Sequence, residues 1–138
     1  MRTMAIDYGD AHTGIAISDP TGLLAGYTTV ITAYRGEQVA ERIKALAKEH
    51  GVEELVLGNP INMDGTRGPR SEKAQALKDL LEAQTGLPVV LWDERRTTID
   101  AHQILFNGGK NARQRKKVVD AVAASLILEG YLTYRKSR

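Results

Sequence analysis

MAIDYGDAHTGIAISDPTG, residues 4–22, contains two short apolar runs, each followed by turn-forming residues. The first run ends at Asp7 and is typical of a buried central strand. The YGD sequence over 8–10 predicts a turn into a second strand over 14–18, and DPTG over 19–22 predicts another turn after it. A third strand is expected over about 24–31. Because the links between these strands are so short, the three should form an antiparallel meander.

Downstream of the meander, apolar periodicity predicts helices that alternate with short strands. The expected segments are a helix over 37–50, a strand over 55–57, a helix over 71–84, a strand over 88–92, a helix from Thr97 through Leu105, and a last helix over about 115–134. The apolar stripe expected on that last helix is Val119, Val122, Ala123, Leu126 and Ile127. The sequence therefore predicts an α/β protein with a five-stranded mixed sheet and helices on both faces. Right-handed crossovers would place the last two strands beside the first and parallel to it.

Composition excludes several kinds of site. The chain has 138 residues, no cysteine and only three histidines, none of them spaced as in a zinc site. Any metal would therefore be bound by oxygen, which favours magnesium or manganese. An acid at position 7 interrupts the N-terminal apolar run, and no run is long enough to span a membrane. We expect a soluble, cytoplasmic protein of one domain that makes no membrane contact.

Acidic residues stand next to apolar sequence at three places. Asp7 ends the first strand, Asp93 and Glu94 end the last strand, and Asp120 lies within the last helix. Parallel strands bring their C-terminal ends to one edge of the sheet, where ligands of α/β proteins bind. Carboxylates gathered there would repel one another unless a divalent cation lay between them, and such ions support phosphodiester hydrolysis.

Each acid also has a purely structural interpretation. Asp7 could be a turn residue, and Asp93 could cap the helix that follows it. Asp120 could be a surface residue paired with Lys116 or Lys117 at helical spacing. The three positions together favour a metal site more than any one of them alone.

Four motifs in order resemble the YqgF family, also called RuvX, a Holliday-junction-resolvase-like family with the RNase H-like fold. They are Asp7-Tyr8-Gly9 with Gly14, the GNPINMDGT loop over 58–66, Asp93-Glu94-Arg95 with Thr97-Thr98, and Val119-Asp120 with Ala123-Ala124 and the ILE sequence over 127–129. The resemblance covers essentially the whole chain, as a single RNase H-like nuclease domain over 1–138.

The resemblance implies a magnesium- or manganese-dependent nuclease that matures the 5′ end of pre-16S ribosomal RNA. Asp7, Glu94 and Asp120 would be the catalytic carboxylates and metal ligands, with Asp93 held in reserve. The fourth strand is followed by Gly58-Asn59-Pro60 and offers no acid there. Two departures bear on activity. Ala11-His12 stands where the family commonly has Lys-Arg, and Val118 stands where it often has Lys.

Basic residues cluster near the predicted site. Lys110, Arg113, Arg115, Lys116 and Lys117 form a run without an intervening acid, and Arg67, Arg70 and Arg95 lie in loops expected at the same edge. Cations at the start of a helix oppose its dipole, so they favour phosphate binding over a role in helix stability. A solvated helix start is the alternative. The tail from Arg135 onward is expected to be a frayed, solvated end.

Three functions are considered for this sequence. The leading one is a two-metal phosphodiesterase that acts on RNA, with branched or single-stranded DNA as the alternative substrate. The second is a non-catalytic RNA-binding factor in ribosome assembly. The third, a sugar-kinase-like ATPase, also begins with Asp-x-Gly, but 138 residues are too few for its two lobes. Both a monomer and a homodimer are compatible with the sequence.

Overall fold

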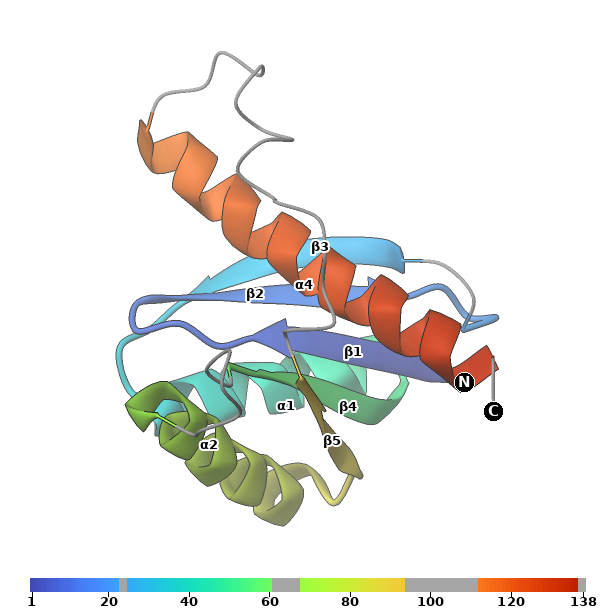
Figure 1. Cartoon of the computed structure of the whole chain (residues 1–138). Coiled ribbons are helices and arrows are strands. Elements are labelled where there is room, and N and C mark those ends of the chain that lie inside the picture. The colour runs from blue at the N-terminus through green and yellow to red at the C-terminus, as the bar shows by residue number, and fades with distance from the viewer. Residues whose placement is uncertain (23–24, 61–67, 94–111, 137–138) are drawn as a thin grey trace.

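The computed structural model describes residues 1–22, 25–60, 68–93 and 112–136. Within these ranges the elements follow the predicted order of strands and helices (Figure 1). They are β1 (Arg2–Asp7), β2 (His12–Ser18), β3 (Ala25–Thr32), α1 (Gly36–His50), β4 (Val52–Asn59), α2 (Pro69–Thr85), β5 (Val89–Asp93) and α4 (Ala112–Lys136). The helix predicted from Thr97 lies outside the described residues.

The five strands form one mixed sheet in the order β3-β2-β1-β4-β5. β1 pairs antiparallel with β2, and β2 pairs antiparallel with β3, as expected for the meander. β4 lies parallel to β1, and β5 lies parallel to β4. The C-terminal ends of β1, β3, β4 and β5 therefore meet at one edge of the sheet, which we call the C-terminal edge. The predicted fold class is confirmed.

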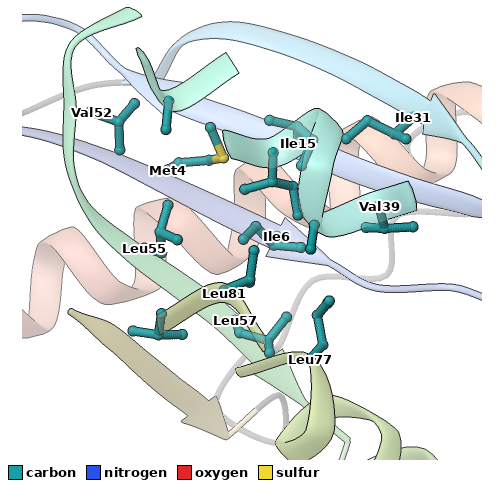
Figure 2. Close-up of a cluster of buried hydrophobic side chains, with 14 of the residues drawn as sticks. Met4, Ile6, Ile15, Ile31, Val39, Val52, Leu55, Leu57, Leu77 and Leu81 are labelled. Carbon is teal, nitrogen blue, oxygen red and sulfur yellow. The ribbon is translucent and has the colours of Figure 1, made fainter. Parts of the chain in front are cut away.

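The alternation of side chains divides the core between two faces of the sheet. On one face, residues of β1, β2 and β4 pack against Val39 of α1 and against Leu77 and Leu81 of α2 (Figure 2). On the other face lies α4 (Figure 1), which packs over the small residues Ala5 and Ala16. The small residues allow α4 to lie close to the strands.

Glycines end α1 and α2 where the sequence predicts. Gly51 follows α1 with a φ of 66°, and Gly86 follows α2 with a φ of 69°. Both are in the left-handed region, which favours a residue without a side chain at a helix end. Among the described residues, no helix is long and apolar enough to cross a membrane.

The buried face of α4 differs from the predicted stripe. Its buried residues are Ala124, Ile127, Leu128, Tyr131 and Leu132. Of the five predicted, only Ile127 is fully buried. The middle of α4, residues 118–128, is apolar on several sides, so periodicity alone does not fix which side faces the sheet. Contacts with the strands make that choice.

The C-terminal end of α4 is anchored, and the prediction of a frayed end is wrong for Arg135. Its guanidinium donates to Oγ1 of Thr3 at 3.0 Å, to Oε1 of Glu54 at 3.1 Å and to the carbonyl of Gly22 at 3.1 Å. The Tyr131 hydroxyl donates to the other carboxylate oxygen of Glu54 at 2.8 Å. These contacts come from separate parts of the chain, which is why local sequence did not predict them.

Replacing Glu54 should destabilise the fold, because it would leave Arg135 and Tyr131 without their shared acceptor. We expect Glu54→Ala to lower the free energy of unfolding by about 2–3 kcal/mol, measured by urea denaturation. Glu53→Ala is the matched control, since the neighbouring Glu53 side chain is exposed. It should cost no more than about 0.5 kcal/mol. Equal midpoints for the two variants would show that the anchor adds nothing.

Candidate active site

Asp7 is the last residue of β1, at the C-terminal edge of the central part of the sheet. Because side chains alternate along a strand, Asp7 points to the same face of the sheet as Thr3 and Ala5. Ala5 packs in the core beneath α4. Asp7 therefore belongs to the sheet face that α4 covers. It is only partly buried, so solvent and ligands can reach this position.

Gly14 joins Asp7 to the helix that carries Asp120. Gly14 is the antiparallel partner of Asp7, so the two residues are neighbours on the same face of the sheet. The backbone of α4 rests directly on Gly14. A Cβ built there would overlap the carbonyl oxygen of Asp120 and lie 2.6 Å from its carbonyl carbon. Asp7 and the Asp120 backbone thus adjoin the same glycine.

Asp120 is not an exposed helix residue. It is one turn before Ala124, which is completely buried against the sheet, and its own Oδ2 is buried. This placement disfavours the interpretation of Asp120 as a solvent-facing partner of nearby lysines. It favours a role at the junction between α4 and the C-terminal edge.

The last residues of β4 and β5, Asn59 and Asp93, are placed differently from Asp7. Asn59 is paired in register with Asp93, and its buried side chain accepts a hydrogen bond from Ser71 at 2.7 Å. That bond ties the end of β4 to the first turn of α2. In the alternation of β5, Asp93 shares the face of Val89 and Leu91, which pack on the α1 and α2 side. Asp93 is thus on the opposite face from Asp7.

Only some of the predicted site residues belong to the part of the chain that the structure describes. Glu94, Arg67, Arg95 and Lys110 lie outside the described residues. The side chains of Arg113, Arg115, Lys116 and Lys117 also lie outside them, although their backbone forms the start of α4. Arg70 is exposed in the first turn of α2, which begins near the end of β4. Its position at the C-terminal edge agrees with the predicted one.

The donor chemistry of the site fits a hard divalent cation. Asp7 and Asp120 offer carboxylate oxygens on one face, which magnesium and manganese prefer. Within the described ranges, no group of three acidic or histidine side chains is close enough to hold a metal. A third ligand would come from the part of the chain that includes Glu94.

The turn between β1 and β2 is tightly folded beside the site. A Cβ on Gly9 would overlap the carbonyl oxygen of His12, so this position has no room for a side chain. The end of β3 is attached to the same turn, because the amide of Ala33 donates to the carbonyl of Ala11 at 3.0 Å. In the sequence, Gly9 and Gly14 are recognised only as parts of a motif, which does not show what each one contacts. For Gly14, the position of a glycine within β2 is the signal for a close approach of another backbone.

Solved structures define the class of fold. The RuvC protein of T. thermophilus bound to a Holliday junction substrate matches with a TM-score of 0.65 and 14% identity, over 98% of this chain and 96% of that one. The fowlpox virus Holliday junction resolvase matches with a TM-score of 0.59 and 16% identity over the whole of both chains. The chain therefore has the RuvC-like form of the RNase H fold.

Sequence relationships identify the family within that class. Residues 1–134 match the RuvX family, described as Holliday junction resolvase. A protein of Halothermothrix orenii is 44% identical over 135 residues, which cover 98% of this chain and 96% of that protein. One from Listeria monocytogenes is 45% identical over 134 residues, covering 96% and 97%. Both are named "Putative pre-16S rRNA nuclease". This chain belongs to the RuvX family, as its motifs predicted.

Proposed function

We propose that this chain is a divalent-metal-dependent nuclease that hydrolyses phosphodiester bonds of pre-16S ribosomal RNA during maturation of its 5′ end. The observation that carries the proposal is the shared contact of Asp7 and Asp120 with Gly14 at the C-terminal edge. A protein that only bound RNA would have no need for two aspartates at this position. The names of the relatives support the choice of RNA.

Asp7, Asp120 and Glu94 would hold magnesium or manganese. When bound, such ions make a nucleophilic water available at neutral pH and neutralise charge on the phosphate. The protein's own contribution is rigidity. Asp7 is fixed by strand pairing, and Asp120 is fixed by the contact of its backbone with β2. The backbone positions that carry the two carboxylates are therefore set before substrate binds.

The RNA backbone would be held by cations on both sides of the carboxylates. α4 runs antiparallel to β1, since its C-terminal end lies at Thr3 and Asp120 lies near the end of that strand. Residues 112–119 therefore continue past Asp120 by about 12 Å. Arg113, Arg115, Lys116 and Lys117 are on this extension, and Arg70 is across the edge on α2. We include Arg67, Arg95 and Lys110 in the same proposed interface.

A four-way DNA junction is the second candidate substrate. The family's description and the fold shared with junction resolvases favour it. The chemistry at the carboxylates would be the same, because both substrates present a phosphodiester. The two proposals differ only in which nucleic acid the surrounding cations position.

Metal-dependent cleavage assays test the proposal directly. Purified protein would be incubated with labelled RNA containing the 5′ leader of 16S rRNA, and separately with a four-way DNA junction. Each reaction would contain Mg²⁺, Mn²⁺ or EDTA. We expect cleavage of the RNA with either metal and none with EDTA. Faster cleavage of the junction would instead assign junction resolution.

Binding without cleavage would contradict the catalytic proposal. If the protein binds the RNA in a salt-sensitive way but cuts neither substrate with any metal, it acts as a non-catalytic assembly factor. Cleavage that persists in EDTA would equally contradict a divalent-metal mechanism.

A further inference from the structure

Tyr34 is an unusually exposed aromatic residue at the edge of the sheet that carries the proposed site. It is 77% exposed, the highest value among the large apolar side chains of the described residues. It lies two residues after the end of β3, in the connection to α1. This connection leaves the sheet at the C-terminal edge, as does Asp7.

The other two exposed tyrosines are already in contact with aromatic rings. Tyr27 lies at the opposite end of β3 with its ring 4.7 Å from that of His50. Tyr134 lies 5.7 Å from the ring of Trp92. Both are about half as exposed as Tyr34, at 42% and 41%. Tyr34 is therefore the tyrosine best placed to offer a ring face to a ligand.

The backbone beside Tyr34 is fixed on both sides. Ala33 is buried in the core, and its amide donates to the carbonyl of Ala11 in the turn that follows Asp7. On the other side, the carbonyl of Arg35 accepts from the amide of Val39 and so begins α1. An aromatic ring on such a fixed segment loses little conformational entropy on binding, which favours its use as a stacking platform.

Distance and charge also suit a nucleic-acid strand. Gly14 pairs with both Asp7 and Val30, so Val30 of β3 lies about 10 Å from Asp7 across the sheet. Tyr34 follows four residues later, which adds at most about 14 Å along the chain. A strand bound at Asp7 could therefore reach Tyr34 with a nearby nucleotide. Arg35, the next residue in the chain, is exposed and could contact a phosphate, while the exposed Glu37 in the first turn of α1 would disfavour phosphates beyond it.

We propose that Tyr34 stacks on an unpaired base of the RNA strand close to the phosphodiester that is cut. This inference rests on the proposed function, since it assumes that RNA lies along the C-terminal edge. Bases within a duplex are already stacked on their neighbours. The platform would therefore make the protein prefer a single-stranded flank, whatever the base.

Binding to a short unstructured RNA oligonucleotide in EDTA tests the inference without cleavage. Fluorescence anisotropy would compare wild type, Tyr34→Ala and Tyr34→Phe. We expect the alanine variant to bind about 5- to 100-fold more weakly, because a base–aromatic contact is lost. The phenylalanine variant, which keeps the ring, should stay within about threefold of wild type. Tyr27→Ala is the matched control and should bind like wild type.

A duplex of the same sequence gives a second readout. Its affinity should be insensitive to Tyr34→Ala, because it has no unpaired base to stack. Equal losses on single-stranded and duplex RNA, or no loss on either, would overturn the stacking inference. The same holds if wild type fails to bind single-stranded RNA. Tyr34-dependent binding by a protein that never cuts would instead overturn only the proposed hydrolysis.

Discussion

Asp7→Asn should abolish RNA cleavage while leaving RNA binding nearly intact. The amide has the size of the carboxylate but no charge, so a divalent ion would lose a ligand. We expect the cleavage rate to fall by about a thousandfold, equivalent to about 4 kcal/mol of transition-state stabilisation. Single-turnover cleavage in Mn²⁺ would measure the rate, and anisotropy would measure RNA affinity.

Asp93→Asn is the control for this experiment. Asp93 also ends a strand at the C-terminal edge, but it belongs to the face covered by α1 and α2. Its substitution should change the rate by no more than a few-fold. If Asp93→Asn proves as damaging as Asp7→Asn, Asp93 rather than Glu94 would be the third carboxylate. Retention of full activity by Asp7→Asn would contradict the proposed site.

Gly14→Ala should damage both the fold and the activity. The new methyl group would overlap the carbonyl of Asp120 and lie 3.3 Å from the amide nitrogen of Ala121. Both are helix backbone, which cannot turn aside as a flexible side chain could. We expect a loss of about 1–3 kcal/mol in unfolding free energy, as for an overpacked core. Cleavage should fall further than this loss explains, because α4 would shift at Asp120.

Gly51→Ala separates the loss of stability from the loss of the site. Gly51 has a positive φ, so alanine there would be strained by about 1 kcal/mol, but a Cβ would meet open space. Gly14 is not among the glycines with positive φ. Cleavage by Gly51→Ala should therefore match wild type at temperatures where both are folded. A Gly14→Ala variant that is stable and active would show that α4 does not need its close contact with β2.

Most of the fold was predictable because it depends on local signals. Apolar runs and turn residues gave the strands, and Gly51 and Gly86 marked the helix ends. Right-handed crossovers predicted that β4 and β5 run parallel to β1 and lie beside it, and β4 does pair with β1, whereas β5 pairs with β4. Segment ends were less accurate. β4 begins at Val52 rather than at Leu55, and α4 begins at Ala112 rather than near Arg115.

The features that sequence did not predict depend on contacts between distant segments. The buried side of α4 is selected by the strands beneath it, since its sequence is apolar on more than one side. Arg135 was expected to be solvated because its partners Thr3 and Glu54 lie far away in the chain. For the site, the sequence predicted Asp7 and Asp120, and the structure places both at Gly14. The role of Glu94 stays a prediction.

Two glycines determine how closely α4 approaches the sheet, and the points of α4 at these two contacts, Asp120 and Gly130, are ten residues apart. Gly14 of β2 receives the helix at Asp120, and Gly130 of α4 leaves room for the ring of Trp92, which would lie 3.3 Å from an added Cβ. Each helical residue advances the direction of a side chain by about 100°. An inserted or deleted residue between 120 and 130 would thus turn Asp120 away from Asp7 while Gly130 stayed in place. In relatives that keep both contacts, this part of α4 should vary in composition but not in length.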